Sequence, residues 1–203
     1  MIAAPSGAGK TSLVKALLAR RPGLAVSVSH TTRPQRPSEV AGRDYHFVTV
    51  PEFLAERDAG GFLEYAEVYG NYYGTHRAEV ERSLAEGRTV ILEIDWQGAE
   101  QVRRSWPGCT SIFILPPSRA TLEARLRNRR TDSDEVIARR LAVAEQEMSH
   151  FHEFDCVIVN DDFEQAVEQL LGVLDGRTAD LGPDRAQLAP LLAGLLAGNA
   201  AMR

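Results

Sequence analysis

Hydrophobic positions along this chain fall into short apolar runs separated by longer segments with helical spacing. Residues 11–20 carry Leu13, Val14, Leu17 and Leu18 on one helical face, and Arg21-Pro22-Gly23 follows as a stop signal. A short strand is predicted at 24–28. Residues 89–94, 110–115 and 156–159 are nearly unbroken apolar runs, which is typical of strands buried on both faces of a parallel sheet.

The segments between these strands predict helices at 77–86, closed by Gly87, at 99–105, at 163–174, and from a cap at Ser118 to about Arg127. Another helix is predicted from Asp132, with Glu135 in capping-box position. Its apolar face comprises Val136, Ile137, Leu141, Ala144 and Met148. Because strands and helices alternate, the sequence predicts an α/β fold with a parallel sheet covered on both faces.

In residues 33–75, strands and long helices do not alternate in this way. Residues 29–42 are polar and read as a loop, and strands are predicted at 45–50 and 62–68, with a short helix at 52–57 and a turn at Tyr69-Gly70-Asn71. We interpret 33–75 as a small mixed β insertion. The tail after Gly176 is rich in Ala and Leu, and its amphipathic helix is expected to dock on the core or on a partner chain; its leucines are Leu188, Leu191, Leu192, Leu195 and Leu196.

Length and composition limit the classes of function that are expected of this chain. With 203 residues, of which 44% are hydrophobic, the chain is expected to form one substantial core. Its net charge of −5 argues against non-specific nucleic-acid binding. The sequence shows no leader and no apolar run long enough to span a membrane, so a cytoplasmic protein is expected.

Residues 4–11, Ala-Pro-Ser-Gly-Ala-Gly-Lys-Thr, match a phosphate-binding loop except that Ala4 replaces the first consensus glycine. Glycines let backbone amides converge on an anion at a helix N-terminus, Lys10 would reach the terminal phosphates, and Thr11 would face Mg²⁺. The alternative, a Gly-rich turn that merely caps a helix, leaves Lys10-Thr11 unexplained. Only Met1 to Ala3 precede the loop, so either the first strand is unusually short or the natural chain begins upstream.

Further motifs continue along the chain: Ser29-His30-Thr31-Thr32-Arg33-Pro34, Gly42-Arg43-Asp44-Tyr45-His46-Phe47, Gly70-Asn71-Tyr72-Tyr73-Gly74-Thr75, Glu93-Ile94-Asp95-Trp96-Gln97-Gly98, Thr131-Asp132-Ser133 and Val159-Asn160-Asp161-Asp162. With the loop, they make the chain resemble the guanylate kinases of bacterial type from Ile2 to about Leu174. That family commonly has alanine at the Ala4 position.

The resemblance implies a P-loop NTPase three-layer fold with a central parallel sheet, in which residues 1–175 form the kinase-like domain and 176–203 a helical tail. Within it the core would be 1–32, 76–124 and 155–175, the GMP-binding insertion 33–75, and a helical lid 125–154. The implied reaction is ATP-dependent phosphorylation of GMP to GDP with Mg²⁺. ATP and GMP are then the partners, nucleic acid and membrane are not, and a homo-oligomer is an open option.

For ATP, the resemblance implies that Lys10, Arg125, Arg129 and Arg140 act in catalysis, that Thr11 contacts Mg²⁺, and that Asn160 lies near adenine. The implied ATP-binding residues are Pro5, Ser6, Gly7, Ala8, Gly9, Lys10, Thr11, Ser12 and Asn160. The family usually has glycine where this chain has Arg130. A solvated basic helix end is the competing interpretation of the arginine cluster, and a turn-forming asparagine that of Asn160.

For GMP, the implied phosphate-binding residues are Arg33, Arg36, Tyr45 and Tyr73, and the implied guanine-binding carboxylate is Glu64. Ser29 and Thr75 match hydroxyl positions of the pocket, and Glu93 and Asp95 end a predicted buried strand near the nucleotides. A guanidinium can meet phosphate with two parallel hydrogen bonds, and a carboxylate can accept from the donor edge of guanine. The competing interpretations are a solvated loop for the arginines, an outward strand residue for Glu64 and a helix cap for Asp95.

Two other functions fit parts of the pattern. Guanylate-kinase-like modules of scaffold proteins bind peptides without catalysis, but they generally lack an intact phosphate loop. A kinase of the same fold acting on a phosphorylated sugar is the second alternative. GMP is favoured over it by the combination of Arg33, Arg36, Tyr45, Glu64, Tyr73 and Thr75.

Overall fold

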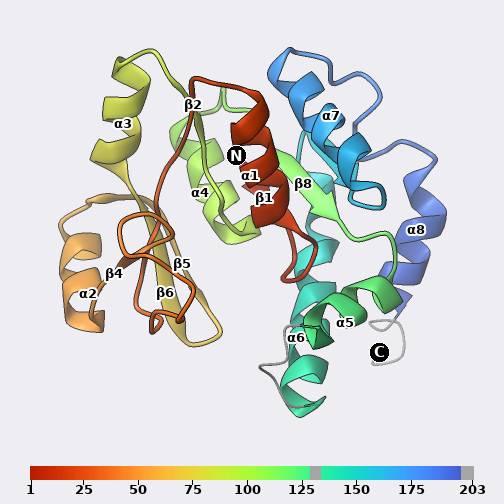
Figure 1. Cartoon of the computed structure of the whole chain (residues 1–203), viewed down its shortest axis with the longest axis horizontal. Coiled ribbons are helices and arrows are strands. Elements are labelled where there is room, and N and C mark those ends of the chain that lie inside the picture. The colour runs from red at the N-terminus through yellow and green to blue at the C-terminus, as the bar shows by residue number, and fades with distance from the viewer. Residues whose placement is uncertain (129–133, 198–203) are drawn as a thin grey trace. The chain divides into compact units, whose positions relative to one another are not determined.

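A computed structural model describes residues 1–128 and 134–197 (Figure 1). The chain divides into two compact units, each described by itself below. The terminal unit comprises Ile2–Arg21 and Thr110–Arg203, and the central unit comprises Met1 and Pro22–Cys109. Among the described residues, every helix is too short or too polar to cross a lipid bilayer.

The terminal unit is built on a parallel sheet of β1 (Ile2–Ala3), β8 (Ile112–Leu115) and β9 (Cys156–Val159), in the order β1-β8-β9. Ile2 pairs with Ile112, and Ile112 with Cys156. All four residues of β8 are buried, as a strand covered on both faces requires. The predicted parallel strands are therefore present.

Helices surround this sheet: α1 (Lys10–Arg20), α5 (Arg119–Arg127), α6 (Asp134–Ser149), α7 (Phe163–Leu174) and α8 (Leu188–Leu195), with a short 3₁₀ turn at Phe151–Glu153. Helix α1 lies beside α7, and α5 beside α6 (Figure 1). Apolar side chains of α1 and α7, such as Leu13, Leu17 and Leu170, are fully buried. Burial of each such side chain contributes about 2 kcal/mol.

The prediction for α6 needs one correction. Its predicted start at Asp132 lies outside the described residues, and the helix is described from Asp134. Ile137, Leu141, Ala144 and Met148 are buried as expected, but Val136 is 39% exposed. A helical face that packs on one neighbour covers only a stripe, and Val136 lies outside that stripe.

The tail packs on its own unit and covers the edge strand β9. The Val157 backbone N–H donates to Leu181 O at 2.7 Å, and Arg185 Nη1 donates to Val157 O at 2.7 Å. Leu188 and Leu195 of α8 are buried. Of the two alternatives left open by the sequence, the structure has the tail helix docked within the chain itself.

The central unit contains a parallel pair, β2 (Leu24–Val26) with β7 (Thr89–Ile91), and a mixed sheet in the order β4-β3-β6-β5. Its strands are β3 (His30–Thr31), β4 (His46–Phe47), β5 (Phe62–Val68) and β6 (Asn71–His76). β3 is parallel to β4 and antiparallel to β6, and β5 and β6 form a hairpin. Tyr69 and Gly70 both have positive φ, as a tight hairpin turn requires.

Three helices belong to this unit: α2 (Val50–Asp58), α3 (Arg77–Ala85) and α4 (Trp96–Ser105). All three pack on β5. Phe53 of α2 stacks on Phe62 with ring centroids 4.5 Å apart, and both rings are buried. These rings form the core under the mixed sheet, so the predicted mixed β region is confirmed.

Several boundaries differ from the prediction. The strand predicted at 45–50 spans only His46–Phe47, because Thr49 and Glu52 form a capping box that begins α2 at Val50. The strand predicted at 89–94 ends at Ile91, and Asp95 caps α4, which begins at Trp96 rather than at residue 99. β3 and β6 were not predicted. The predicted boundaries of core, insertion and lid remain predictions.

Candidate active site

The loop at residues 4–9 turns tightly into α1. Gly7 and Gly9 both adopt φ of 96°, a left-handed conformation that favours glycine, and Gly9 is the N-cap of α1. Gly9 supplies no side-chain hydrogen bond to the first turn of α1. Lys10 and Thr11 are the first two residues of this helix, and Ser12 follows. The local geometry is that of an anion-binding helix N-terminus.

Asn160, which follows β9, is hydrogen-bonded to this loop. Its Nδ2 donates to Ala8 O at 2.7 Å, and the Asn160 side chain is buried. A Cβ on Gly9 would lie 2.4 Å from the same Nδ2, and one on Gly7 would lie 2.9 Å from Leu122 Cδ1. The two glycines are therefore required by packing as well as by φ.

Two further contacts fix the loop. Arg125 Nη1 donates to Ala8 O at 3.3 Å, and Arg125 Nη2 donates to Asn160 O at 3.1 Å. The Ser6 backbone N–H donates to Glu147 Oε2 at 3.2 Å. Arg125, expected among the lid arginines, thus contacts the loop backbone. No sequence pattern distinguishes Glu147, since a carboxylate on a helix is usually a solvated surface residue.

Three other predicted residues of the terminal unit are less informative. Arg140 lies on α6 and is half-buried, and Pro5 accepts from the Ala8 N–H at 3.1 Å within the loop turn. Arg129 lies outside the described residues.

In the central unit, Glu64 and Thr75 face each other across the β5-β6 hairpin. Thr75 Oγ1 donates to Glu64 Oε1 at 2.5 Å, and the two residues are only 4% and 1% exposed. Glu64 Oε2 lies so near Gly98 that a Cβ there would be 2.3 Å away. Gly98 is in the first turn of α4, whose N-terminal dipole favours a carboxylate. Glu64 is therefore an inward, buried acid and not the outward strand residue of the competing interpretation.

Asp95 caps α4. Its Oδ1 accepts from the Gly98 N–H at 2.8 Å and its Oδ2 accepts from Gln97 Nε2 at 3.1 Å. This is the helix-capping role that the sequence left open. Glu93, two residues earlier, is half-buried, and its charge helps raise the pKa of Tyr45.

Arg33 lies among aromatic rings. Its guanidinium carbon is 5.3 Å from the centroid of Tyr45, and the rings of Tyr45 and Tyr73 meet edge to face at 6.1 Å. Burial, then the neighbouring Tyr73 and Glu93, raises the pKa of Tyr45, so its hydroxyl remains a donor. Ser29 precedes β3, and its carbonyl accepts from the His46 N–H at 2.9 Å. The structure thus brings Arg33, Tyr45 and Tyr73 together.

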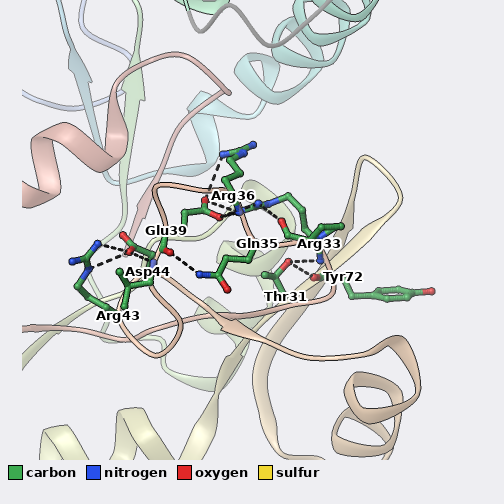
Figure 2. A network of polar contacts seen from close by, with 10 residues as sticks. Thr31, Arg33, Gln35, Arg36, Glu39, Arg43, Asp44 and Tyr72 are labelled. Atoms are coloured by element: carbon green, nitrogen blue, oxygen red, sulfur yellow. Dashed lines mark hydrogen bonds and ion pairs between the residues drawn. The ribbon is translucent and has the colours of Figure 1, made fainter.

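Glu39 is a residue of this cluster that the sequence analysis missed. Its carboxylate accepts from both Nη atoms of Arg33, at 3.1 and 2.8 Å, and from the backbone N–H of Arg36 at 2.8 Å (Figure 2). Glu39 lies a few residues after Arg33 and Arg36, and this spacing was the available signal. In a polar loop, however, the same spacing is also expected of a carboxylate that faces solvent.

A family model described as guanylate kinase matches residues 1–176 of this chain. The chain belongs to the guanylate kinase family. A guanylate kinase of Methylococcus capsulatus is 57% identical over 196 residues, which cover 97% of this chain and 96% of that protein. One of Aromatoleum aromaticum is 57% identical over 174 residues, covering 86% and 85%.

A solved structure agrees with these sequence similarities. The crystal structure of guanylate kinase from Anaplasma phagocytophilum is similar with a TM-score of 0.73 at 35% identity, covering 88% of this chain and 84% of that one. The predicted membership of the guanylate kinase family and the predicted P-loop kinase fold are confirmed.

Proposed function

We propose that this protein transfers the γ-phosphoryl group of ATP to GMP, forming ADP and GDP. One observation carries the proposal: a chain similar over 97% of its length to a guanylate kinase has both the Lys10-Thr11 loop and the buried Glu64–Thr75 pair. The loop would bind any nucleoside triphosphate, and the Glu64–Thr75 pair would bind guanine. A phosphate oxygen of GMP attacks the γ-phosphorus, and the bond from that phosphorus to the β,γ-bridging oxygen breaks, leaving ADP.

The loop would hold the triphosphate through its backbone. The amides at the start of α1, which Gly9 does not cap with a side chain, would donate to phosphate oxygens, and Lys10 would neutralise charge that develops on the leaving group. Asn160 and Arg125, which both donate to Ala8 O, would help to keep the loop in this shape.

The residues present fit a Mg²⁺ ion that arrives with the nucleotide. Among the described residues, no group of three or more His, Cys, Asp or Glu side chains could hold a metal by itself. Thr11, exposed on the first turn of α1, offers one hydroxyl, and phosphate oxygens and water would supply the other ligands. Bound in this way, Mg²⁺ would offset charge on the transferred group.

The central unit would bind GMP at both ends. Glu64 would accept from guanine N1–H and the exocyclic amine, a donor edge that adenine lacks. Arg33 and Arg36 would pair with the phosphate, and Tyr45 and Tyr73 would donate phenol hydrogens to it. Because the attacking phosphate is already an anion, no general base is needed, and the arginines Arg125, Arg129 and Arg140 would spread transition-state charge.

ADP formation from Mg-ATP, with GMP, AMP, UMP and CMP offered separately, tests the proposal. Turnover with GMP alone is expected. A folded protein that turns over none of them would instead be a peptide-binding module or a sugar-phosphate kinase. A screen of phosphorylated sugars and a peptide-binding assay separate those two. The Lys10→Ala variant is the control for the loop, because it should stay folded and lose turnover by at least about 100-fold.

A further inference from the structure

The loop that carries both proposed phosphate-binding arginines is closed by one acidic residue. Figure 2 shows the Glu39 carboxylate lying between Arg33 and Arg36. The Arg33–Glu39 pair is bidentate, at 3.1 and 2.8 Å, and each of the two side chains is 13% exposed. The Arg36 guanidinium is 3.7 Å from Glu39 Oε1 and is 52% exposed.

The same residue holds the backbone of that loop. Its Oε2 accepts from the Arg36 N–H, its own N–H donates to Arg36 O at 3.0 Å, and its carbonyl accepts from Gln35 Nε2 at 2.6 Å. Arg33 Nη1 also donates to Pro34 O at 2.6 Å. Two of these contacts anchor the Glu39 backbone in the loop, and the Arg36 N–H holds its carboxylate independently of any arginine side chain. Glu39 is thus part of the loop structure that holds the two arginines.

The pKa shifts of Glu39 and Arg33 are consistent with a charged pair. Burial alone raises the pKa of Glu39, but the hydrogen bonds from Arg33 and the Arg36 amide hold that pKa below its usual value. Burial, the largest single effect, lowers the pKa of Arg33, but the hydrogen bond and charge of Glu39 together with Tyr73 exceed it, so that pKa is raised. Both groups are therefore charged whenever the protein is folded near neutral pH.

We propose that Glu39 is a positioning residue for the GMP phosphate: it holds Arg33 in place from one end and orients Arg36 through its backbone, so that both meet the phosphate in a prepared geometry. This inference rests on the proposed function. An arginine pre-ordered by a second group loses less conformational entropy when the phosphate binds. Glu39 acts through the arginines and has no contact of its own with substrate.

The Glu39→Gln variant tests this role. Glutamine keeps an oxygen for the Arg36 N–H but cannot form the charged, bidentate pair with Arg33. KM for GMP should rise about tenfold, kcat should change less, and KM for ATP should stay as in the wild type. In an Arg33→Met background, adding Glu39→Gln should change KM for GMP much less, because the two residues act as one unit.

Asp44→Asn is the matched control. Asp44 lies in the same loop region, accepts from the Val40 N–H at 2.9 Å and pairs with the exposed Arg43, which belongs to no proposed site (Figure 2). It makes the same carboxylate-to-amide change and should leave KM for GMP unaltered. An equal rise in both variants would reduce Glu39 to a general loop contact.

Two kinetic results for Glu39→Gln alone would overturn the proposal. A lower KM for GMP in Glu39→Gln would mean that the carboxylate competes with the phosphate, and an unchanged KM would mean that the arginines need no frame. NMR of the Arg33 guanidinium without nucleotide separates this inference from the proposed function. The Arg33 Nη signals should broaden and exchange faster in Glu39→Gln than in the wild type, whether or not the wild type phosphorylates GMP. Unchanged signals would contradict the positioning role directly.

Discussion

Asn160 donates its side-chain Nδ2 to the carbonyl of Ala8 at 2.7 Å, across a sequence separation of 152 residues. The contact joins the turn after β9 to the phosphate loop within one unit. A family resemblance placed Asn160 near adenine, whereas the structure has its amide on the loop backbone. Both contacts can occur in one residue, because an amide also has an acceptor oxygen.

Asn160→Asp should therefore destabilise the fold more than Asn160→Ala. The aspartate has the same shape but turns an acceptor toward Ala8 O, and it buries a charge, whereas alanine only removes the bond. The loss should be about 1–3 kcal/mol for alanine and larger for aspartate. Urea unfolding of the three proteins at pH 7 measures this. Equal losses would indicate that the amide orientation is unimportant.

Gly9→Ala should lower the stability of the fold much more than Gly87→Ala. Both glycines have positive φ, but a Cβ at Gly87 meets nothing within 4 Å, while one at Gly9 lies 2.4 Å from a buried, hydrogen-bonded Asn160 amide. The backbone term is about 1–2 kcal/mol at either position. Only Gly9→Ala adds the clash and should also reduce kcat/KM for ATP. Thermal unfolding with ATP kinetics checks both, and matching losses in the two variants would contradict the close contact.

Glu64→Gln should reduce kcat/KM for GMP by about 100-fold or more, because an amide cannot accept from both guanine donors and leaves buried groups unpaired. KM for ATP should hold. Thr75→Val is the companion variant, because it removes the hydroxyl that donates to Glu64 without removing the carboxylate, and it should have the milder effect. Steady-state kinetics with GMP and with AMP decide the matter. An unaltered base preference in Glu64→Gln would exclude this carboxylate from the guanine pocket.

Acid should destabilise the protein through His30. Its ring stacks on His46 at 4.6 Å and lies 5.6 Å from His76. Burial first, then these two histidines, lowers the pKa of His30 to about 4, against the opposing effect of Glu79 and Glu56. Between pH 6.5 and about 4 the unfolded chain binds a proton here that the folded chain does not, so stability falls as pH falls through this window.

His30→Gln should remove that contribution. The stability lost between pH 7 and pH 5 should be smaller in the variant by about 1 kcal/mol, a figure that allows for solvent screening of a half-buried ring. Denaturant midpoints at the two pH values give the double difference. The same pH dependence in both proteins would assign the acid sensitivity to other groups.

The sequence predicted the elements whose signals are local. Strand β9 was predicted with its observed limits, and the Ser118 cap of α5 and the Gly87 stop of α3 are as expected. The capping box of Thr49 and Glu52, with Pro51 between them, is an equally local signal that the predicted helix start did not use. Local side-chain patterns carry this information because caps and turns use backbone groups only a few residues away.

The elements that were missed depend on distant partners. Strand β6 contains Gly74, which looks like a break, yet a Cβ there would be 3.0 Å from Phe62 and 3.1 Å from Phe53, so the glycine makes room for two rings. Strand β3 lies in a polar segment and exists because β4 and β6 pair with it. The candidate site likewise contains residues with a local sequence signal and residues without one. Motifs identified Arg33, Tyr45 and Tyr73, but nothing local distinguished Glu39 as their support.

The backbone of the tail at Leu181 and the side chain of Arg185 together imitate a neighbouring strand. The edge of a sheet offers unpaired amides and carbonyls on which another chain can be templated. Here one carbonyl accepts from the Val157 N–H and one guanidinium donates to the Val157 carbonyl, so β9 presents no open pairing at that residue. At Val157 the tail therefore occupies the backbone groups through which a further strand would pair. The Arg185→Ala protein should accordingly form thioflavin-positive aggregates sooner on mild heating, and an unchanged lag time would show that the Leu181 carbonyl alone is enough.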